Sequence, residues 1–222
     1  MKMSLRKKLE KLKHASSRRV IYNSKNKTVV KFYPAFYGYV LHDVVRIIFY
    51  VMNGVYFASF TLPKKRIDNE IKAREILAEA GVRTTRIRRF SKKEKLLEEY
   101  FVGDAYTLDD LEKIDCKKAI RFANKIGRIT RKLNDSGHYF IDNRASNWLV
   151  NRGLVRTDLE FFVSKKKNRK FSMFCDVLSL VSSVENEEVA CSFMKGYGKK
   201  IKPPFLFELF ANLYIKITDV IF

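Results

Sequence analysis

The stretch "GHYFIDNRASNWLV" (residues 137–150) places a polar segment between two apolar runs. The polar segment sets a carboxylate, Asp142, and an amide, Asn147, five residues apart, and Trp148 follows at once. A loop that only reverses the chain direction needs no more than Gly, Pro or Ser. Chemically active side chains on a loop between apolar flanks therefore predict a functional site.

The composition predicts a folded and strongly basic protein. A chain of 222 residues is long enough to bury one large core or the cores of two small lobes. Its 46% hydrophobic and 14% aromatic residues argue against disorder. The excess of 45 Lys and Arg over 24 Asp and Glu gives a formal charge of +21, which predicts an anionic partner. Charge alone does not choose between nucleic acid, acidic lipid and a phosphorylated substrate.

Cysteine usage and the N-terminal segment predict a cytoplasmic protein. Cys116, Cys175 and Cys191 form no C-x-x-C pair, which argues against a zinc site or a disulfide framework and fits a reducing compartment. The basic start lacks the apolar segment of a signal peptide. The longest apolar stretch, at 47–60, has 14 residues, fewer than the roughly 20 of a membrane span.

Hydrophobic periodicity predicts a strand-rich first half with one clear helix. The helix is expected at 67–80 and ends before Gly81. The remaining elements expected here are a basic amphipathic helix at 2–14, a hairpin at 18–34 that turns at 23–26, and a strand pair within 84–103. The segment 39–60 is expected to form one or two helices, or to end in a strand. The 2–14 helix fits either a solvated packing helix or one that contacts membrane or nucleic acid.

The second half is predicted to be mainly helical. Helices are expected at 107–114, 117–137 and 204–222, with a short strand pair after residue 147. Because strands and helices are segregated along the chain, we predict an α+β protein with two lobes. The predicted lobes are 1–102 and 103–222, and a cleft between lobes is a natural ligand site.

The spacing of Asp142, Asn147 and Asp158 matches the needs of phosphoryl transfer. This reaction requires a carboxylate to orient the attacking hydroxyl, an amide and a second carboxylate to hold Mg²⁺, and a lysine on the phosphates of ATP. Protein kinases place an Asp and an Asn five residues apart and a second Asp after a short hairpin. Here Asp158 follows a predicted strand, a turn at 151–153 and a second strand.

Lys31 and Glu70 are the candidates for the phosphate lysine and its carboxylate partner. Lys31 directly follows a valine pair at a strand end, whereas Lys25 and Lys27 lie closer to the predicted turn. Glu70 is preferred over Glu75 because of its distance from the end of the predicted helix.

Three segments resemble the compact atypical branch of the protein-kinase-like superfamily, which includes the lipopolysaccharide (Kdo and heptose) kinases, the RIO kinases and the kinase of the KEOPS complex. The segments are "NEIKAREILAEAGVRTTRI" (69–87), "LLEEYFVGDAYTLDDL" (96–111) and "LNDSGHYFIDNRASNWLV" (133–150). The resemblance extends over about residues 28–185, and its catalytic-loop part is the most specific. It implies a two-lobed kinase-like fold that uses ATP and Mg²⁺.

The resemblance also implies roles for individual residues. Asp142 would be the catalytic base, Asn147 and Asp158 the metal ligands, and Lys31 the phosphate lysine with Glu70 as its partner.

Further implied roles concern the adenine, the γ-phosphate and the support of the loop. Backbone groups between Glu99 and Val102 would contact adenine, and Arg144 would face the γ-phosphate. Asp176 would support the catalytic loop from below, the alternative being a plain helix cap.

Three departures from the family pattern leave a catalytically inactive pseudokinase open. Phe140 stands where His is usual, and "YNSKNK" (22–27) stands where a glycine-rich phosphate loop is expected. Leu-Glu follows Asp158 in place of Phe-Gly.

The leading functional expectation is a kinase that phosphorylates a hydroxyl of an anionic sugar, glycolipid or related acceptor. The basic run at 165–170 suits an anionic acceptor, and the amphipathic termini suit peripheral contact with an acidic inner membrane face. The alternatives are an RNA-associated Ser/Thr kinase or ATPase of RIO or KEOPS type, with nucleic acid as the partner, and a pseudokinase scaffold.

Overall fold

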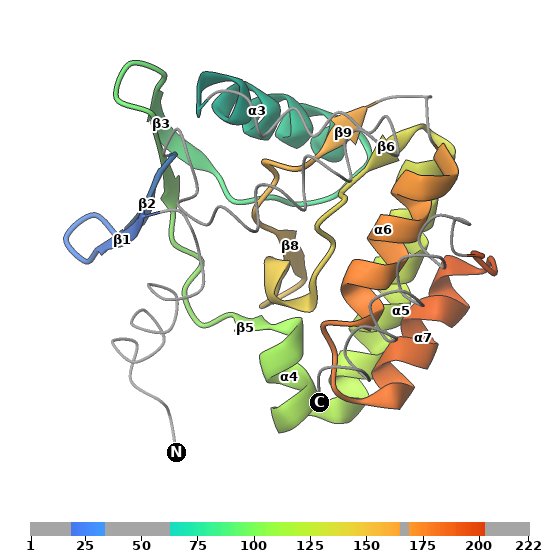
Figure 1. Cartoon of the computed structure of the whole chain (residues 1–222). Coiled ribbons are helices and arrows are strands. Elements are labelled where there is room, and N and C mark those ends of the chain that lie inside the picture. Colours follow the sequence, from blue (N-terminus) through green and yellow to red (C-terminus); the bar gives the residue numbers. More distant parts are fainter. Residues whose placement is uncertain (1–18, 34–62, 165–168, 203–222) are drawn as a thin grey trace, which may run out of the picture.

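A four-stranded antiparallel sheet forms the N-terminal part of the computed structural model, which describes residues 19–33, 63–164 and 169–202 (Figure 1). Its strand order is β1-β2-β4-β3. The strands are β1 (Arg19–Asn23), β2 (Thr28–Phe32), β3 (Ile87–Ser91) and β4 (Leu96–Tyr100). The hairpin predicted at 18–34 and the strand pair predicted within 84–103 are thus confirmed.

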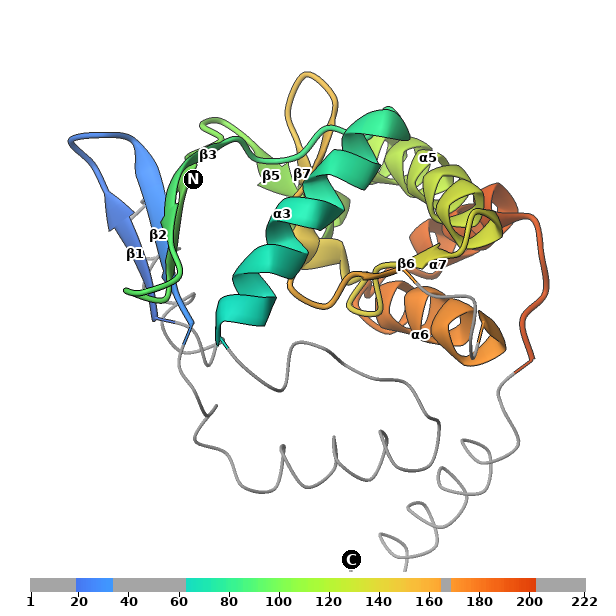
Figure 2. The ribbon, with the colours of Figure 1, turned by 90° about the horizontal axis from the view of Figure 1, so that it is seen from above.

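Helix α3 (Pro63–Glu79) lies between this sheet and the helical part of the molecule, as Figure 2 shows from above. Ile67 packs with Tyr33 and Leu97 in a small core cluster beside the sheet. Ala73 and Leu77, two turns later, belong to the large core cluster of the helical part. The helix ends before Gly81, whose φ of 76° suits glycine, as predicted.

The C-terminal part consists mainly of helices. These are α4 (Leu108–Ile114), α5 (Cys116–Asp135), α6 (Arg169–Val181) and α7 (Glu187–Tyr197). The helices begin at capping residues that suit their role: Thr107 Oγ1 accepts from Asp110 N (3.2 Å) and Asp115 Oδ1 accepts from Lys118 N (3.1 Å). Helices α5 and α7 approach closely, because Gly127 and Gly196 each lie against the backbone of the other helix.

Two small sheets carry the polar loop. One has the order β5-β7-β8, with β5 (Tyr106–Thr107), β7 (Trp148–Val150) and β8 (Leu154–Arg156). The other pairs β6 (His138–Tyr139) with β9 (Val163–Ser164). The loop between β6 and β7 ends in a 3-10 turn, Ala145–Asn147. The architecture is therefore α+β, with a strand-rich N-terminal part and a mainly helical C-terminal part.

Some expectations concern other parts of the chain. The helices predicted at 2–14, 39–60 and 204–222, and most of the basic run at 165–170, lie outside the described residues. Within the described ranges, no helix is long and apolar enough to cross a membrane.

Candidate active site

Asp176 of α6 holds the backbone of the loop from below. Its Oδ2 accepts a hydrogen bond from Phe140 N (3.2 Å) and its Oδ1 accepts one from Ile141 N (2.5 Å). Asn134 Nδ2 of α5 donates to Oδ2 as well (2.7 Å). Burial raises the pKa of Asp176 to about 7, although these three donors favour the charged form. The expectation that Asp176 supports the loop is confirmed.

Asn143 connects the loop to α5 and α6. Its backbone N donates to Ser179 Oγ (2.8 Å), and its Nδ2 donates to Thr130 Oγ1 (3.2 Å). The indole Nε1 of the fully buried Trp148 donates to Asn143 Oδ1 (2.9 Å). Because each of these buried polar groups is satisfied, they fix one loop conformation.

Asp142, Arg144 and Asn147 lie together in this loop, with Arg144 exposed and Asn147 buried. Arg144 donates two hydrogen bonds to the carboxylate of Asp142, from Nε (2.6 Å) and Nη2 (2.9 Å). Asn147 Nδ2 donates to the backbone O of Asp142 (3.1 Å) and approaches its Oδ2 (3.4 Å). The Arg144 side chain is 55% exposed and that of Asp142 16%. The pair is therefore open to solvent, and the arginine can leave the carboxylate when an anion attracts it.

The hairpin of β7 and β8 brings Asp158 back toward Asn147. Thr157 donates to the backbone O of Asn147 from both its N (3.0 Å) and its Oγ1 (3.2 Å). Asp158 is the next residue and has a φ of 52°, a left-handed conformation that is uncommon for residues other than Gly and that Asp adopts more readily than most. Uncommon backbone conformations of this kind are concentrated at functional sites.

The donors present fit Mg²⁺, which prefers a few protein oxygens and keeps its other positions for water and phosphates. Because the Nδ2 of Asn147 is directed to Asp142, its Oδ1 is the atom available to a cation. Asp158 adds a carboxylate from the neighbouring strand end. Among the described residues, no group of three or more His, Cys, Asp or Glu side chains could hold a metal ion. The candidate metal ligands are therefore the amide of Asn147 and the carboxylate of Asp158.

Lys31 and Glu70 meet across the sheet and α3. The Nζ of Lys31 lies 3.6 Å from Glu70 Oε1 and 3.0 Å from Glu99 Oε2. Glu70 is fully buried and Lys31 is 6% exposed, whereas Lys25 and Glu75 are exposed. The structure therefore pairs the two residues that the sequence analysis preferred.

Glu99 is the first residue of the segment that was expected to contact adenine. It lies within β4, an inner strand of the sheet, and pairs with Val29 on one side and Ile87 on the other. Its backbone is therefore part of the sheet, and its side chain joins Lys31. The expectation that backbone groups between Glu99 and Val102 contact adenine stays a prediction, and Val102 lies in the connection between β4 and β5.

Arg74 was not identified from the sequence. Its guanidinium contacts Glu70 Oε2 (2.6 Å) and also Glu99, and its Nε donates to Thr85 O (3.1 Å). Two cations and two carboxylates thus gather beneath the sheet with balanced charge. The position of Arg74 four residues after Glu70 on one helix was the available signal.

Helix α3 also contacts the segment after Asp158. Asn69 Nδ2 donates to the backbone oxygens of Glu160 and Phe162 (2.7 Å each). Arg66 lies 3.7 Å from the carboxylate of Glu160, and both side chains are 1% exposed. One helix therefore positions both Lys31, through Glu70, and the chain that leaves Asp158.

Arg156 supports the loop beside Phe140, the position at which the resembling kinases usually have a histidine. This fully buried guanidinium lies over the Phe140 ring, 4.7 Å from its centroid, and 5.3 Å from that of Trp148. Its Nη2 donates to the backbone O of Asp142 (2.6 Å). Burial lowers the pKa of Arg156 to about 10, so it stays charged at neutral pH. A loop-supporting donor is thus present although the family's usual histidine is not.

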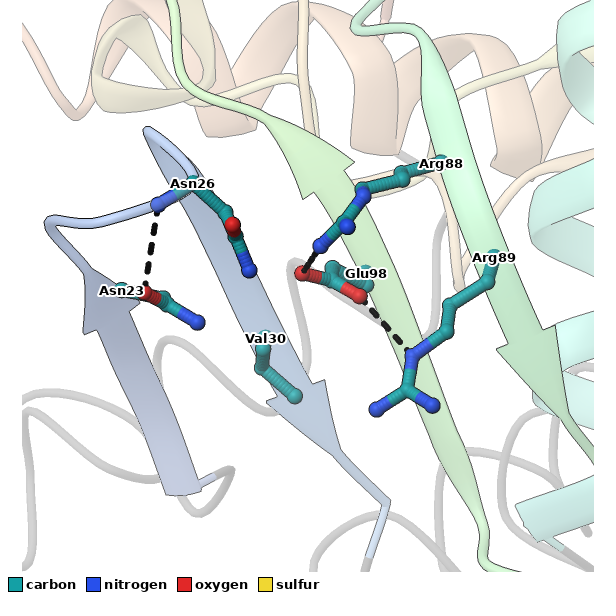
Figure 3. Close-up of a pocket in the computed structure, with 6 residues that line it drawn as sticks. All are labelled: Asn23, Asn26, Val30, Arg88, Arg89 and Glu98. Atoms are coloured by element: carbon teal, nitrogen blue, oxygen red, sulfur yellow. Dashed lines mark hydrogen bonds and ion pairs between the residues drawn. The ribbon is translucent and has the colours of Figure 1, made fainter.

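The turn that the sequence analysis considered for phosphate lies away from Lys31. Asn23 and Asn26 line a cavity on the other face of the sheet, together with Val30 and Glu98 (Figure 3). Successive residues of a strand point to opposite faces, so Val30 and Lys31 do not share one. The turn therefore does not face the ion pairs of Lys31.

Solved structures, but no family model and no curated protein, are similar to this chain. No family model matches the sequence, and no curated protein matches it. Among solved structures, the chain is similar to WaaP in complex with acyl carrier protein, with 13% identity over 84% of this chain and 77% of that chain and a TM-score of 0.52.

Two further solved structures are similar at lower scores. The Rio2 kinase of Chaetomium thermophilum, in an ADP/Mg²⁺-phosphoaspartate complex, has 13% identity over 83% of this chain and 59% of that chain, with a TM-score of 0.49. The choline kinase LicA of Streptococcus pneumoniae has 12% identity over 85% and 73%, with a TM-score of 0.43. The architecture and the WaaP match together show that the chain has the two-lobed fold of the protein-kinase-like superfamily.

Proposed function

We propose that this protein is an ATP- and Mg²⁺-dependent phosphotransferase that acts on a hydroxyl group of an anionic acceptor. The observation that carries the proposal is the arrangement around Asn147. This one residue contacts Asp142 through its side chain and the strand end before Asp158 through its backbone oxygen. A base and two metal ligands in such proximity are what phosphoryl transfer requires from a protein.

In this proposal Asp142 orients the acceptor hydroxyl and accepts its proton. A carboxylate acts as a base only if it is free to face the hydroxyl, so Arg144 must move from Asp142 toward the transferred phosphoryl group. The exposure of Arg144 supports this movement. Its guanidinium then stabilises negative charge that develops in the transition state.

The same proposal assigns the nucleotide and the metal to this chain's own residues. Bound Mg·ATP supplies the phosphoryl group and the cation that neutralises it. Asn147 Oδ1 and Asp158 hold the cation, the ammonium of Lys31 steadies the phosphates, and the backbone near Val102 contacts adenine. Glu70 keeps Lys31 in position through their 3.6 Å ion pair.

A basic stripe on α5 supports an anionic acceptor at an acidic membrane surface. We define the basic stripe as the exposed residues Lys117, Arg121, Lys125, Arg128 and Lys132. Their spacing of four, four, three and four residues places them on one face of the helix. Like charges at this spacing destabilise an isolated helix, which favours an anionic partner. A lipopolysaccharide-type acceptor agrees with the similarity to WaaP, a lipopolysaccharide kinase.

The first test is thermal unfolding with and without ATP and Mg²⁺. A ligand present at 100 times its Kd adds about 2.7 kcal/mol of stability. We expect a Mg²⁺-dependent rise in Tm for the wild type that is lost in Asp158→Ala. We also expect Asp142→Asn to keep the rise and to lose phosphate transfer.

The alternative of a pseudokinase scaffold predicts a different result. A scaffold without a nucleotide site gives the same Tm with and without Mg·ATP in the wild type. An RNA-associated kinase would instead bind RNA with an affinity that falls steeply with salt. A gel shift across a salt series separates it from the membrane-associated acceptor.

A further inference from the structure

A β-bulge in β3 brings two consecutive arginines to the outer face of the N-terminal sheet. Ile87 pairs with Glu99 and Arg89 pairs with Glu98, so Arg88 is an extra residue in this strand. Consecutive strand residues ordinarily point to opposite faces. The bulge cancels this alternation, and both Arg88 and Arg89 reach the same carboxylate. Bulges often re-aim side chains in this way beside functional sites.

Glu98 fixes the two guanidiniums. Its Oε1 accepts from Thr28 Oγ1 (2.6 Å) and from Arg88 Nη1 (2.8 Å), and its Oε2 accepts from Arg89 Nε (2.9 Å). Glu98 is 2% exposed, whereas the side chains of Arg88 and Arg89 are 39% and 63% exposed. The Thr28 hydroxyl, together with the two arginines, holds the pKa of Glu98 below its ordinary value. One carboxylate thus pre-orients two cations and leaves a net charge of +1.

A cavity of about 390 Å³ opens over this group (Figure 3). This volume is in the range of small-molecule sites. Arg88 and Arg89 line it on one side and Asn23 and Asn26 on the other, with Val30 as an apolar wall. Because Asn23 Oδ1 accepts a hydrogen bond from Asn26 N (3.3 Å), its amide nitrogen is the atom available to donate.

Further cations lie on the chain segments next to the residues that line the cavity. Lys25 and Lys27 are exposed on the turn that bears the two asparagines. On the same face Arg86 lies over the ring of Tyr100, 4.6 Å from its centroid. These charges suit a dianion better than a singly charged group, because a dianion gains more from a field of several cations.

We propose that this outer cavity is a binding site for a phosphate monoester on a small molecule, distinct from the nucleotide site under the opposite face of the sheet. Arg88 and Arg89 offer the planar forks that bind phosphate oxygens in pairs. The Asn23 amide donates from across the cavity, and Val30 contacts the organic part of the ligand. The site needs neither Lys31 nor Asp158.

The test uses the full chain, with inorganic phosphate and glycerol 3-phosphate as probes and acetate at equal ionic strength as the comparison. We expect saturable binding of both phosphates by calorimetry and none of acetate. Arg89→Gln should weaken phosphate binding at least tenfold, because Arg88 and Thr28 still satisfy Glu98 and the fold is kept. Asn23→Ala should also weaken phosphate binding, and it leaves the hydrogen bonds of Glu98 to Thr28, Arg88 and Arg89 in place.

Lys195→Gln is the matched control, since it removes the same charge from an exposed position on α7. It should bind phosphate like the wild type. Equal affinity in Arg89→Gln, Asn23→Ala and the control would overturn the proposal, as would the absence of saturable binding in the wild type.

A crossed experiment separates this site from the nucleotide site. Asp158→Ala should keep phosphate binding at the outer cavity, and Arg89→Gln should keep the Mg·ATP-dependent rise in Tm. If Asp158→Ala loses phosphate binding while Arg89→Gln keeps it, phosphate binds at the nucleotide site and the outer site is refuted. Loss of the Mg·ATP effect alone would count against the proposed function and leave the outer site standing.

Discussion

Arg156 and Asp142 are joined by a hydrogen bond of 2.6 Å from a buried guanidinium to a backbone oxygen of the polar loop. The same guanidinium covers Phe140, whose position in the resembling family is usually a histidine. The contact shows how this chain supports the loop despite that departure. It also leads to the first prediction.

Arg156→Met should lower the turnover number of the phosphotransferase about tenfold or more while changing stability little. Within the described ranges, Nε and Nη1 of Arg156 make no hydrogen bond, so an apolar side chain of similar length leaves few polar partners unsatisfied. The Asp142 oxygen keeps Asn147 as a donor, so it is not left unsatisfied. Steady-state kinetics should show a fall in kcat with KM for ATP nearly unchanged. A fall in both parameters together with a lower Tm would indicate a merely structural role.

Glu70→Gln should destabilise the protein by about 3 kcal/mol and weaken Mg·ATP binding, since it removes one partner from buried ion pairs. Lys31 and Arg74 both contact this carboxylate. The matched control is Glu75→Gln on the exposed side of the same helix, where we expect a change within about 0.5 kcal/mol. Urea denaturation and the Tm rise with Mg·ATP measure both effects. Similar values for the two variants would contradict the assignment of Glu70.

Asp176 should make stability depend on pH. Its pKa of about 7 in the folded chain exceeds the value of about 3.9 in an unfolded chain, so the folded state holds more protons between these values. Stability from this group is therefore complete below about pH 4 and decreases as the pH rises toward 7. The free energy of unfolding of the wild type minus that of Asp176→Asn should decline from pH 5 to pH 7.5. A difference that stays constant or grows with pH would show that the carboxylate is charged throughout.

Gly127→Ala should destabilise the packing of α5 on α7. A Cβ at this position would collide with the backbone of Phe193 and Tyr197. We expect a loss of about 1–3 kcal/mol, even though alanine favours helices over glycine. Gly103→Ala is the control, because nothing lies within 4 Å of a Cβ there. Equal denaturation midpoints for the two variants would mean that the helices can move apart freely.

The basic stripe should bind vesicles that contain acidic lipid. Each Lys or Arg near such a surface contributes about 1 kcal/mol, so a triple Gln variant at Lys117, Arg121 and Lys125 should lose about 3 kcal/mol of binding free energy. Vesicle pelleting at two salt concentrations measures this loss. A triple Gln variant at 92, 93 and 95, where three exposed lysines lie, removes the same charge elsewhere. Equal losses in both variants would show that net charge alone, and not the stripe, governs binding.

Local sequence was sufficient to predict the polar loop and its hairpin. The five-residue spacing of Asp142 and Asn147, the strand that begins at Trp148 and the hairpin before Asp158 depend on short-range preferences of the chain, and the structure contains each of them. Helix α3 and the two predicted strand pairs likewise followed from periodicity and turn residues. Lys31 and Glu70 were also found from the sequence, because each lies in an element of predictable type.

Other features could be identified only in the folded structure. Glu99 was expected to contribute backbone groups to an adenine site, and the ion pair of its side chain with Lys31 could not be predicted from the local sequence. The bulge that gathers Arg88 and Arg89 on Glu98 depends on the register of β3 against β4, and no local pattern reveals it.

The division between the two sources of information has one physical reason. Hydrophobic period, turn chemistry and spacing are properties of neighbouring residues, so the sequence alone determined the elements, the order of the site residues and the resemblance they carry. Arg156 lies beside Phe140, and Arg74 beside Glu99, only after distant segments pack. The partners of buried charges were therefore decided by tertiary structure, because burial and pairing are set by the whole fold.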